Sequence, residues 1–147
     1  MPELLSETIR KQIKGVFEGL QNDVQVVLFT SEQNCDYCAE TRQLLEEVVA
    51  LSDQLGLTVY DLEKNQLEAG QYKVDKAPGF SIMAKVGENL VDYGIRFYGI
   101  PSGHEFTSLV NDLMLVGSRQ SGLDTETVEF LKGLKEPINL QVFVTPT

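Results

Sequence analysis

The spacing of hydrophobic residues changes along the chain from a helical period to nearly unbroken apolar runs. Between residues 6 and 20 the apolar side chains recur every three or four positions, which predicts an amphipathic helix with one buried stripe. The polar pair Asn22-Asp23 ends this pattern, and the run Val24–Phe29 follows. Such a run is typical of a strand covered on both faces, so we expect a sheet with helices on each side.

The pattern continues with alternating helices and strands up to residue 117. A long amphipathic segment is expected to remain helical to about Leu55 and to end at Gly56, because glycine is preferred just after a helix. Ser102 and Glu105 have the spacing of a capping box, which predicts the start of another helix. The other expected elements are a strand at 57–62, a short helix at 67–72, and strands at 79–84 and 90–98 joined by a turn at 87–89.

The order of these elements indicates a fold class. Two strands joined by a helix form a right-handed parallel crossover, and the later hairpin adds an antiparallel edge. We therefore expect residues 1–117 to form an α/β domain of the thioredoxin type, with a mixed central sheet and helices on both faces.

The remaining thirty residues repeat the opening pattern of the chain. After a linker at 118–123, Asp124 is expected to cap a helix, and residues 138–144 alternate as a strand does. Residues 124–147 are thus expected to be the first helix and strand of a second, truncated thioredoxin-like unit. Because an unpaired strand edge invites association, Leu140–Val144 is predicted to pair with its own sheet or with another chain.

Charge and hydropathy narrow the function. The net charge of −10 leaves no basic surplus to neutralise phosphates, which argues against nucleic-acid binding. No apolar run approaches the roughly 18 residues of a membrane helix, so no membrane partner is expected. The start of the chain lacks the basic-then-apolar pattern of a secretory signal. These features predict a cytoplasmic location.

The candidate chemistry lies in Cys35-Asp36-Tyr37-Cys38, which holds the only two cysteines and joins the first strand to a helix. Side chains three apart on a helix have β-carbons about 5–6 Å apart, and a small adjustment brings them to the roughly 3.5–4.5 Å of a disulfide. Unpaired N–H groups at a helix start favour a thiolate at Cys35, which is the reactive form. The pattern predicts a thiol–disulfide oxidoreductase.

Two other interpretations of the cysteine pair stay open, namely a metal site and two inert small hydrophobes. A zinc site usually needs four ligands, and His104 is the only other soft candidate in the chain. His104 lies near a predicted helix N-terminus, where its cationic form is disfavoured, so a structural or surface role is expected. We expect no metal and no cofactor besides a redox-active disulfide.

Several stretches together resemble a known family. They are Leu28–Thr30 through Cys38, Lys76-Ala77-Pro78, Tyr93–Phe106 and Leu140–Thr147. With them the chain resembles the amino-terminal half of the tandem protein disulfide oxidoreductases, a glutaredoxin-like group of thermophilic archaea and bacteria. Members have two thioredoxin-fold units, each with its own Cys-x-x-Cys, and the last stretch runs straight into the second motif. The resemblance agrees with the truncated second unit.

The resemblance implies roles for single residues. Cys35 would be the attacking thiolate and Cys38 the resolving thiol. Pro78 matches the family's cis-proline, which lies beside the motif and, with Ala77, exposes backbone for a substrate strand. Tyr37 is a further candidate for substrate contact. Asp36 is expected to tune the site, because its charge raises the pKa of a neighbouring thiol.

The chain departs from its relatives at two places. Phe29 stands where bacterial thioredoxins carry a buried acid, so water or Glu32 is expected to handle the proton. Tyr98–Ser102 replaces the Gly-Gly-Asp segment with which glutaredoxins hold glutathione, which weakens the expectation of glutathione use.

Other functions compete with general disulfide exchange. One is an electron relay from a flavin reductase to a peroxidase, as in the amino-terminal region of alkyl hydroperoxide reductase flavoproteins. Another is a glutaredoxin-like module that binds zinc or an iron–sulfur cluster between two chains. A third is a structural half without activity. The expected partners are protein disulfides, with thioredoxin reductase or a peroxiredoxin as further candidates.

Overall fold

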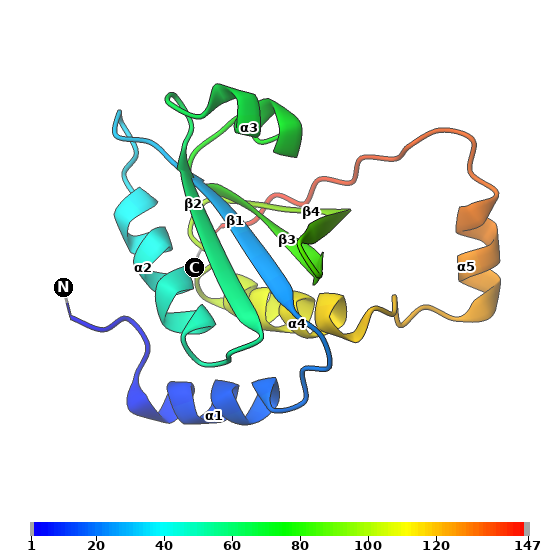
Figure 1. Ribbon diagram of the computed structural model, residues 1–147, viewed down its shortest axis with the longest axis horizontal. Coiled ribbons are helices and arrows are strands. Elements are labelled where there is room, and N and C mark those ends of the chain that lie inside the picture. Colours follow the sequence, from blue (N-terminus) through cyan, green and yellow to red (C-terminus); the bar gives the residue numbers. More distant parts are fainter. Residues whose placement is uncertain (1, 146–147) are drawn as a thin grey trace.

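The computed structural model describes residues 2–145, which form four strands and five helices. In chain order they are α1 (Glu7–Phe17), β1 (Val24–Thr30), α2 (Cys38–Val49), β2 (Leu55–Asp61), α3 (Gln66–Tyr72), β3 (Gly79–Val86), β4 (Asn89–Tyr98), α4 (His104–Ser118) and α5 (Thr125–Lys132) (Figure 1). Within the described residues, no helix is both long and apolar enough to cross a membrane.

The four strands form one mixed sheet in the order β2-β1-β3-β4. Strand β1 is parallel to β2, with Val24 opposite Leu55, and antiparallel to β3, with Phe29 opposite Gly79. Strands β3 and β4 form the antiparallel hairpin at the edge. The parallel crossover and the hairpin predicted from the sequence are both confirmed.

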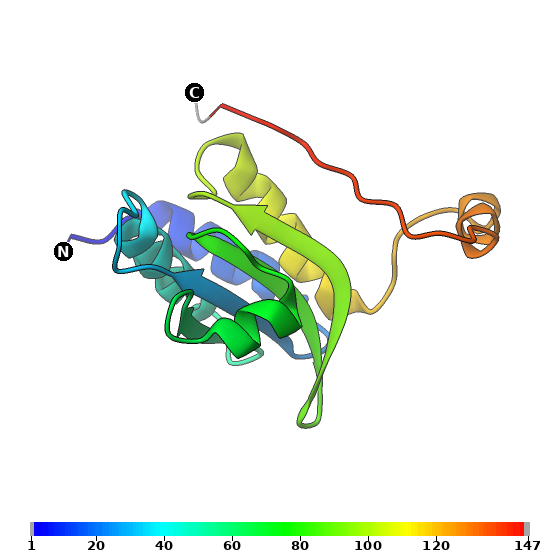
Figure 2. The ribbon, with the colours of Figure 1, turned by 90° about the horizontal axis from the view of Figure 1, so that it is seen from above.

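Strand β1 contributes to a core on each side of the sheet. Val26 and Leu28 lie in the larger core with residues of α1, α2 and α4, whereas Val27 and Phe29 lie in a smaller core against α3. Figure 2 shows this layering, with α3 on one side of the sheet and α1, α2 and α4 on the other. Burial on both faces explains why the run at 24–29 is apolar without alternation.

Helix α2 ends earlier than its pattern indicated. It ends at Val49, and Leu55 already begins β2, so the prediction of a helix to about Leu55 with Gly56 after its end is wrong. Gly56 pairs with Gln25, whose side chain occupies the space that a Cβ at position 56 would need. Close packing within the sheet, rather than a helix end, accounts for this glycine.

Helix α4 begins without the predicted capping box. The cap position is Gly103 and not Ser102, and no side chain caps the helix. Gly103 has a φ of 62°, a left-handed conformation that glycine adopts at little cost. The local turn therefore overrides the spacing of Ser102 and Glu105.

The carboxyl-terminal segment differs most from the prediction. Asp124 Oδ1 accepts the Thr127 N–H at 2.7 Å, which confirms the predicted cap of α5, but α5 has no buried residue. Residues 137–145 form no strand, so the predicted strand and its pairing with the chain's own sheet are wrong; Pro146 and Thr147 lie outside the described residues. Figures 1 and 2 show α5 standing away from the sheet. A strand needs a partner edge, and no described strand offers one to this segment.

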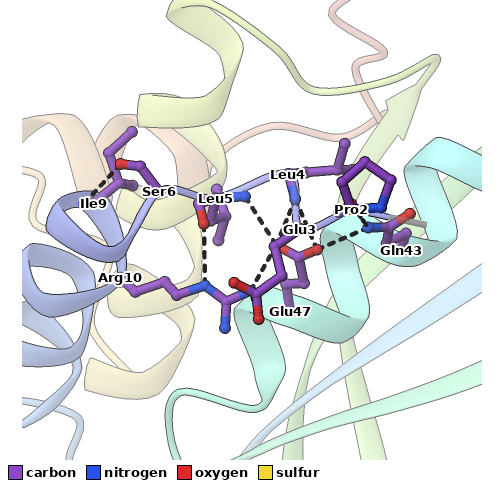
Figure 3. A network of polar contacts seen from close by, with 9 residues as sticks. All are labelled: Pro2, Glu3, Leu4, Leu5, Ser6, Ile9, Arg10, Gln43 and Glu47. Atoms are coloured by element: carbon purple, nitrogen blue, oxygen red, sulfur yellow. Dashed lines mark hydrogen bonds and ion pairs between the residues drawn. The ribbon is translucent and has the colours of Figure 1, made fainter.

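A carboxylate on α2 anchors the start of the chain (Figure 3). Glu47 accepts the N–H groups of Leu4 and Leu5 at 2.9 Å and pairs with Arg10 at 3.1 Å. Burial acts to raise the pKa of Glu47, but the hydrogen bonds from Leu4, Gln43 and Leu5 and the charge of Arg10 outweigh it and hold the pKa below its ordinary value. This network fixes α1 beside α2.

Candidate active site

The two cysteines form a disulfide at the junction between a loop and a helix. Their Cα atoms are 5.5 Å apart. Cys38 is the first residue of α2 and Tyr37 is its cap residue, whereas Cys35 lies in the loop before it. The pair therefore spans the N-terminus of the helix, where unpaired N–H groups favour negative charge.

The two sulfur-bearing residues differ in exposure. Cys38 is 6% exposed and lies in the buried face of α2, while Cys35 is half-buried. A substrate disulfide can therefore reach the sulfur of Cys35 more readily than that of Cys38. Such an arrangement can support attack at one sulfur and release by the other.

Hydrogen bonds position the loop that carries Cys35. The backbone N–H of Ser31 donates to Sγ of Cys38 at 3.4 Å. The Ser31 hydroxyl donates to Glu63 at 2.7 Å and accepts the Gln33 N–H at 3.0 Å. The loop is thus tied both to the buried sulfur and to the turn after β2. Sequence reasoning missed Ser31, because every residue except proline carries an N–H and no pattern marks this one.

The turn after β2 carries charges next to this loop. Hydrogen bonds from the backbone N–H groups of Lys64 and Glu63 hold the pKa of Asp61 below its ordinary value. The Lys64 ammonium lies 2.8 Å from Glu32, and this contact raises the pKa of Lys64. Glu32, the residue expected to handle a proton, is thus engaged with Lys64 at the surface, and its catalytic role stays a prediction.

Pro78 lies at the same end of the sheet as the cysteine loop. It immediately precedes β3, whose first residue, Gly79, pairs with Phe29 near the end of β1. The Ala77–Pro78 peptide bond is cis, as the resemblance implied. Pro78 is buried and its carbonyl accepts the Gly99 N–H at 2.9 Å, whereas Ala77 is half-buried.

The other predicted site residues are exposed. Tyr37 is 57% exposed and Asp36 is exposed too, so both flank the disulfide on its solvent side. His104 is exposed at the first position of α4, which confirms a surface position. Phe29 is fully buried and packs on Tyr60 with ring centroids 5.3 Å apart.

No metal centre is formed by the residues that the structure describes. Nowhere among residues 2–145 do three or more histidine, cysteine, aspartate or glutamate side chains gather closely enough to hold an ion. The chemistry at this site is thus borne by the Cys35–Cys38 disulfide.

Sequence comparison finds relatives that are longer than this chain. The alkyl hydroperoxide reductase protein AhpF of Pseudomonas aeruginosa is 29% identical over 140 residues, which cover 95% of this chain and 24% of that protein. Its counterpart in Staphylococcus epidermidis is 29% identical over 144 residues, with 98% and 25% covered. The chain thus spans about a quarter of the length of these curated relatives. No protein-family model matches it.

Solved structures give the same picture. A protein disulfide oxidoreductase from Aeropyrum pernix K1 superposes with a TM-score of 0.79 and 29% identity, over 88% of this chain and 55% of that one. The NTD_N/C domain of the alkyl hydroperoxide reductase AhpF from Enterococcus faecalis gives a TM-score of 0.74 and 27% identity, over 85% and 58%. The chain therefore belongs to the thioredoxin superfamily of thiol–disulfide oxidoreductases and is similar to these two groups within it.

Proposed function

We propose that the chain exchanges disulfides with a protein substrate, with Cys35 as the attacking thiolate and Cys38 as the resolving thiol. One observation carries this assignment: the disulfide joins a half-buried sulfur-bearing residue on a loop to a buried one at the start of α2. A substrate reaches the first more easily, and the second is placed to displace it.

The reaction balances in two steps. The Cys35 thiolate attacks one sulfur of a substrate disulfide, which forms a mixed disulfide and releases one substrate thiolate that takes a proton from solvent. Cys38 then loses its proton to water and attacks Sγ of Cys35. The Cys35–Cys38 disulfide forms, the second substrate thiolate leaves, and two electrons have passed to the substrate. The reverse sequence forms a disulfide in a reduced substrate.

The substrate strand is proposed to bind beside Ala77 and Pro78. Both lie at the start of β3, at the end of the sheet that also carries the cysteine loop. Tyr37, being 57% exposed next to the disulfide, offers an aromatic surface to the same substrate. Asp36 is exposed beside Cys35 and is proposed to disfavour the Cys35 thiolate through its charge.

A relay function is the second candidate, and the sequence relatives favour it. Those relatives are components of alkyl hydroperoxide reductases. In such a relay the chain would take electrons from a flavoprotein reductase and pass them to a peroxiredoxin. The proposal needs no metal or cofactor on this chain beyond its disulfide, and it keeps the cytoplasmic location, where thiols stay reduced. Residues 124–147 are proposed to begin a second unit.

Reduction of insulin by the purified chain, with dithiothreitol as electron source, tests the proposal. The wild-type chain should accelerate insulin reduction, and Cys35→Ser should abolish the acceleration. Ser121→Ala, a change in the linker far from the disulfide, serves as the control and should leave the rate unchanged. A wild-type chain no faster than dithiothreitol alone would contradict the proposal. Replacing insulin with an oxidised peroxiredoxin then separates the two candidates by rate.

A further inference from the structure

A buried hydroxyl on α2 has no hydrogen-bond partner within the protein. Thr41 is fully buried, and its Oγ1 contacts no donor or acceptor at hydrogen-bond distance. An unsatisfied buried hydroxyl destabilises the folded protein. Valine has almost the same shape without this cost, so the hydroxyl calls for a role that the oxidised structure does not display.

Thr41 lies one helical turn after Cys38. Both belong to the buried face of α2. Side chains three apart on a helix are neighbours, with β-carbons about 5–6 Å apart. A helical side chain also leans towards the turn on its N-terminal side, and for Thr41 that turn begins with Cys38. The hydroxyl is therefore within reach of the sulfur of Cys38 after a rotation about one bond.

The sulfur of Cys38 has a different need in each redox state. In the disulfide it is neutral, and the Ser31 N–H donates to it at 3.4 Å. In the resolving step it must become a thiolate inside the protein, where burial disfavours charge. The position of the buried acid of bacterial thioredoxins is filled here by Phe29, which is fully buried. A second donor at the sulfur would offset part of this cost.

We propose that Thr41 is a positioning residue for the resolving step, donating a hydrogen bond from its hydroxyl to the Cys38 thiolate opposite the Ser31 N–H. This inference rests on the proposed function. Thr41 transfers no proton: Cys38 gives its proton to water, its thiolate attacks Sγ of Cys35, and the substrate thiolate leaves as before. The hydroxyl only stabilises the negative sulfur until the new disulfide forms.

Charged groups on the surrounding elements act on the same sulfur from greater exposure. They are Asp36 on the loop, Glu40 on α2, the Glu32–Lys64 pair, Glu63 after β2, the Asp75–Lys76 pair before β3 and His104 on α4. None of them is buried, so solvent screens their effect. The hydroxyl of Thr41 is buried, and its effect should therefore dominate when position 41 alone is changed.

Titration of Cys38 tests the proposal directly. In Cys35→Ser the thiol of Cys38 is the only one left, because the chain has two cysteines. The ultraviolet absorbance of its thiolate is followed against pH with Thr41, with Thr41→Val and with Thr41→Ser. Loss of one charge-assisted hydrogen bond should raise the pKa of the Cys38 thiol by about one unit in Thr41→Val. Thr41→Ser keeps the hydroxyl and should restore the wild-type titration.

Kinetics in the chain with both cysteines give a second measurement. A shift of one unit lowers the thiolate fraction about tenfold, but a more basic thiolate is more nucleophilic, with a Brønsted coefficient of about 0.4–0.5. Release of a mixed disulfide should therefore slow about threefold to fourfold in Thr41→Val. The oxidised Thr41→Val protein should also melt at a higher temperature than wild type, which checks that the variant is folded.

The outcomes separate the two claims. Equal pKa values with threonine and valine at position 41 would overturn the inference, as would a shift that Thr41→Ser fails to reverse. If Thr41→Val does not fold, Thr41→Ala provides the hydroxyl-free titration and is compared with Thr41→Ser. Failure of the wild-type chain to reduce insulin would instead contradict the proposed function, whatever the titrations give.

Discussion

The backbone N–H of Ser31 donates a hydrogen bond to Sγ of Cys38 across 3.4 Å. This contact links the residue that follows β1 to the buried cysteine, while Cys35 stands half-exposed on the loop between them. The two cysteines are thus inequivalent before any substrate arrives.

This inequivalence predicts different products from the two serine variants. Cys38→Ser should accumulate a mixed disulfide between Cys35 and its substrate, because the resolving thiol is missing. Cys35→Ser should accumulate far less, since Cys38 is 6% exposed. Non-reducing electrophoresis followed by mass spectrometry measures the adducts. Equal trapping by the two variants would contradict the assignment of roles.

Glu47 makes the stability of the fold depend on pH. Its folded-state pKa is below the ordinary value of 4.5, so its contribution is present above that pH and is lost as the pH falls through the folded pKa. Glu47→Gln should lower the free energy of unfolding by about 1–2 kcal/mol at neutral pH. At about pH 3 the difference from wild type should shrink. Urea unfolding at both pH values checks this; a difference independent of pH would count against it.

Arg96 fastens α3 to β4. Its guanidinium donates to the Tyr72 carbonyl at 2.7 and 3.1 Å and to both Asp92 oxygens at 2.9 and 2.6 Å. Lysine cannot reproduce this forked geometry, so Arg96→Lys should cost about 2 kcal/mol. The hydrogen bond from Arg96 also holds the pKa of Asp92 below its ordinary value, and nuclear magnetic resonance titration should show that pKa rising in the variant.

The control for Arg96 is an exposed ion pair. Lys132 lies 3.5 Å from Glu129 with both side chains about two-thirds exposed, and Lys132→Ala should change the stability by less than about 0.5 kcal/mol. Chemical denaturation of the two variants measures both values. A cost for Arg96→Lys as small as that of the control would show that the fork adds nothing.

Gly79 and Gly15 should respond oppositely to alanine. A Cβ at Gly79 would meet the Lys76 carbonyl oxygen at 2.5 Å and Tyr98 at 2.9 Å, so Gly79→Ala should destabilise the protein by about 2 kcal/mol. At Gly15, inside α1, a Cβ meets nothing within 4 Å. Gly15→Ala should stabilise by about 0.5–1 kcal/mol, because alanine is the better helix former. Thermal unfolding of both variants decides, and the same sign for both would refute the packing argument.

Much of the fold was predictable because it depends on hydrophobic spacing. The strand at Val24–Phe29, the hairpin and the helix after the cysteines all follow from patterns of burial. The errors arose where a local pattern had to choose between competing environments. Gly56 was assigned to a helix end, although Gln25 packing explains it, and residues 138–144 alternate without a partner strand.

The site was predictable in its reactive atoms and not in its surroundings. Cys35 and Cys38 form the only possible intrachain pair of cysteines, and Pro78 was found through the resemblance. The donor from Ser31 and the buried hydroxyl of Thr41 depend on how the loop returns over α2. No spacing rule marks a single backbone N–H or a single threonine, so these contacts required the folded chain.

Cys38 belongs to a helix, but Cys35 belongs to a loop that has no helical ladder of its own. Opening the disulfide therefore releases a covalent tie at residues 31–37 and leaves the amides of α2 hydrogen-bonded as before. The redox state of the protein should be legible as deuterium uptake confined to that one loop, with α2 as an internal standard in the same sample.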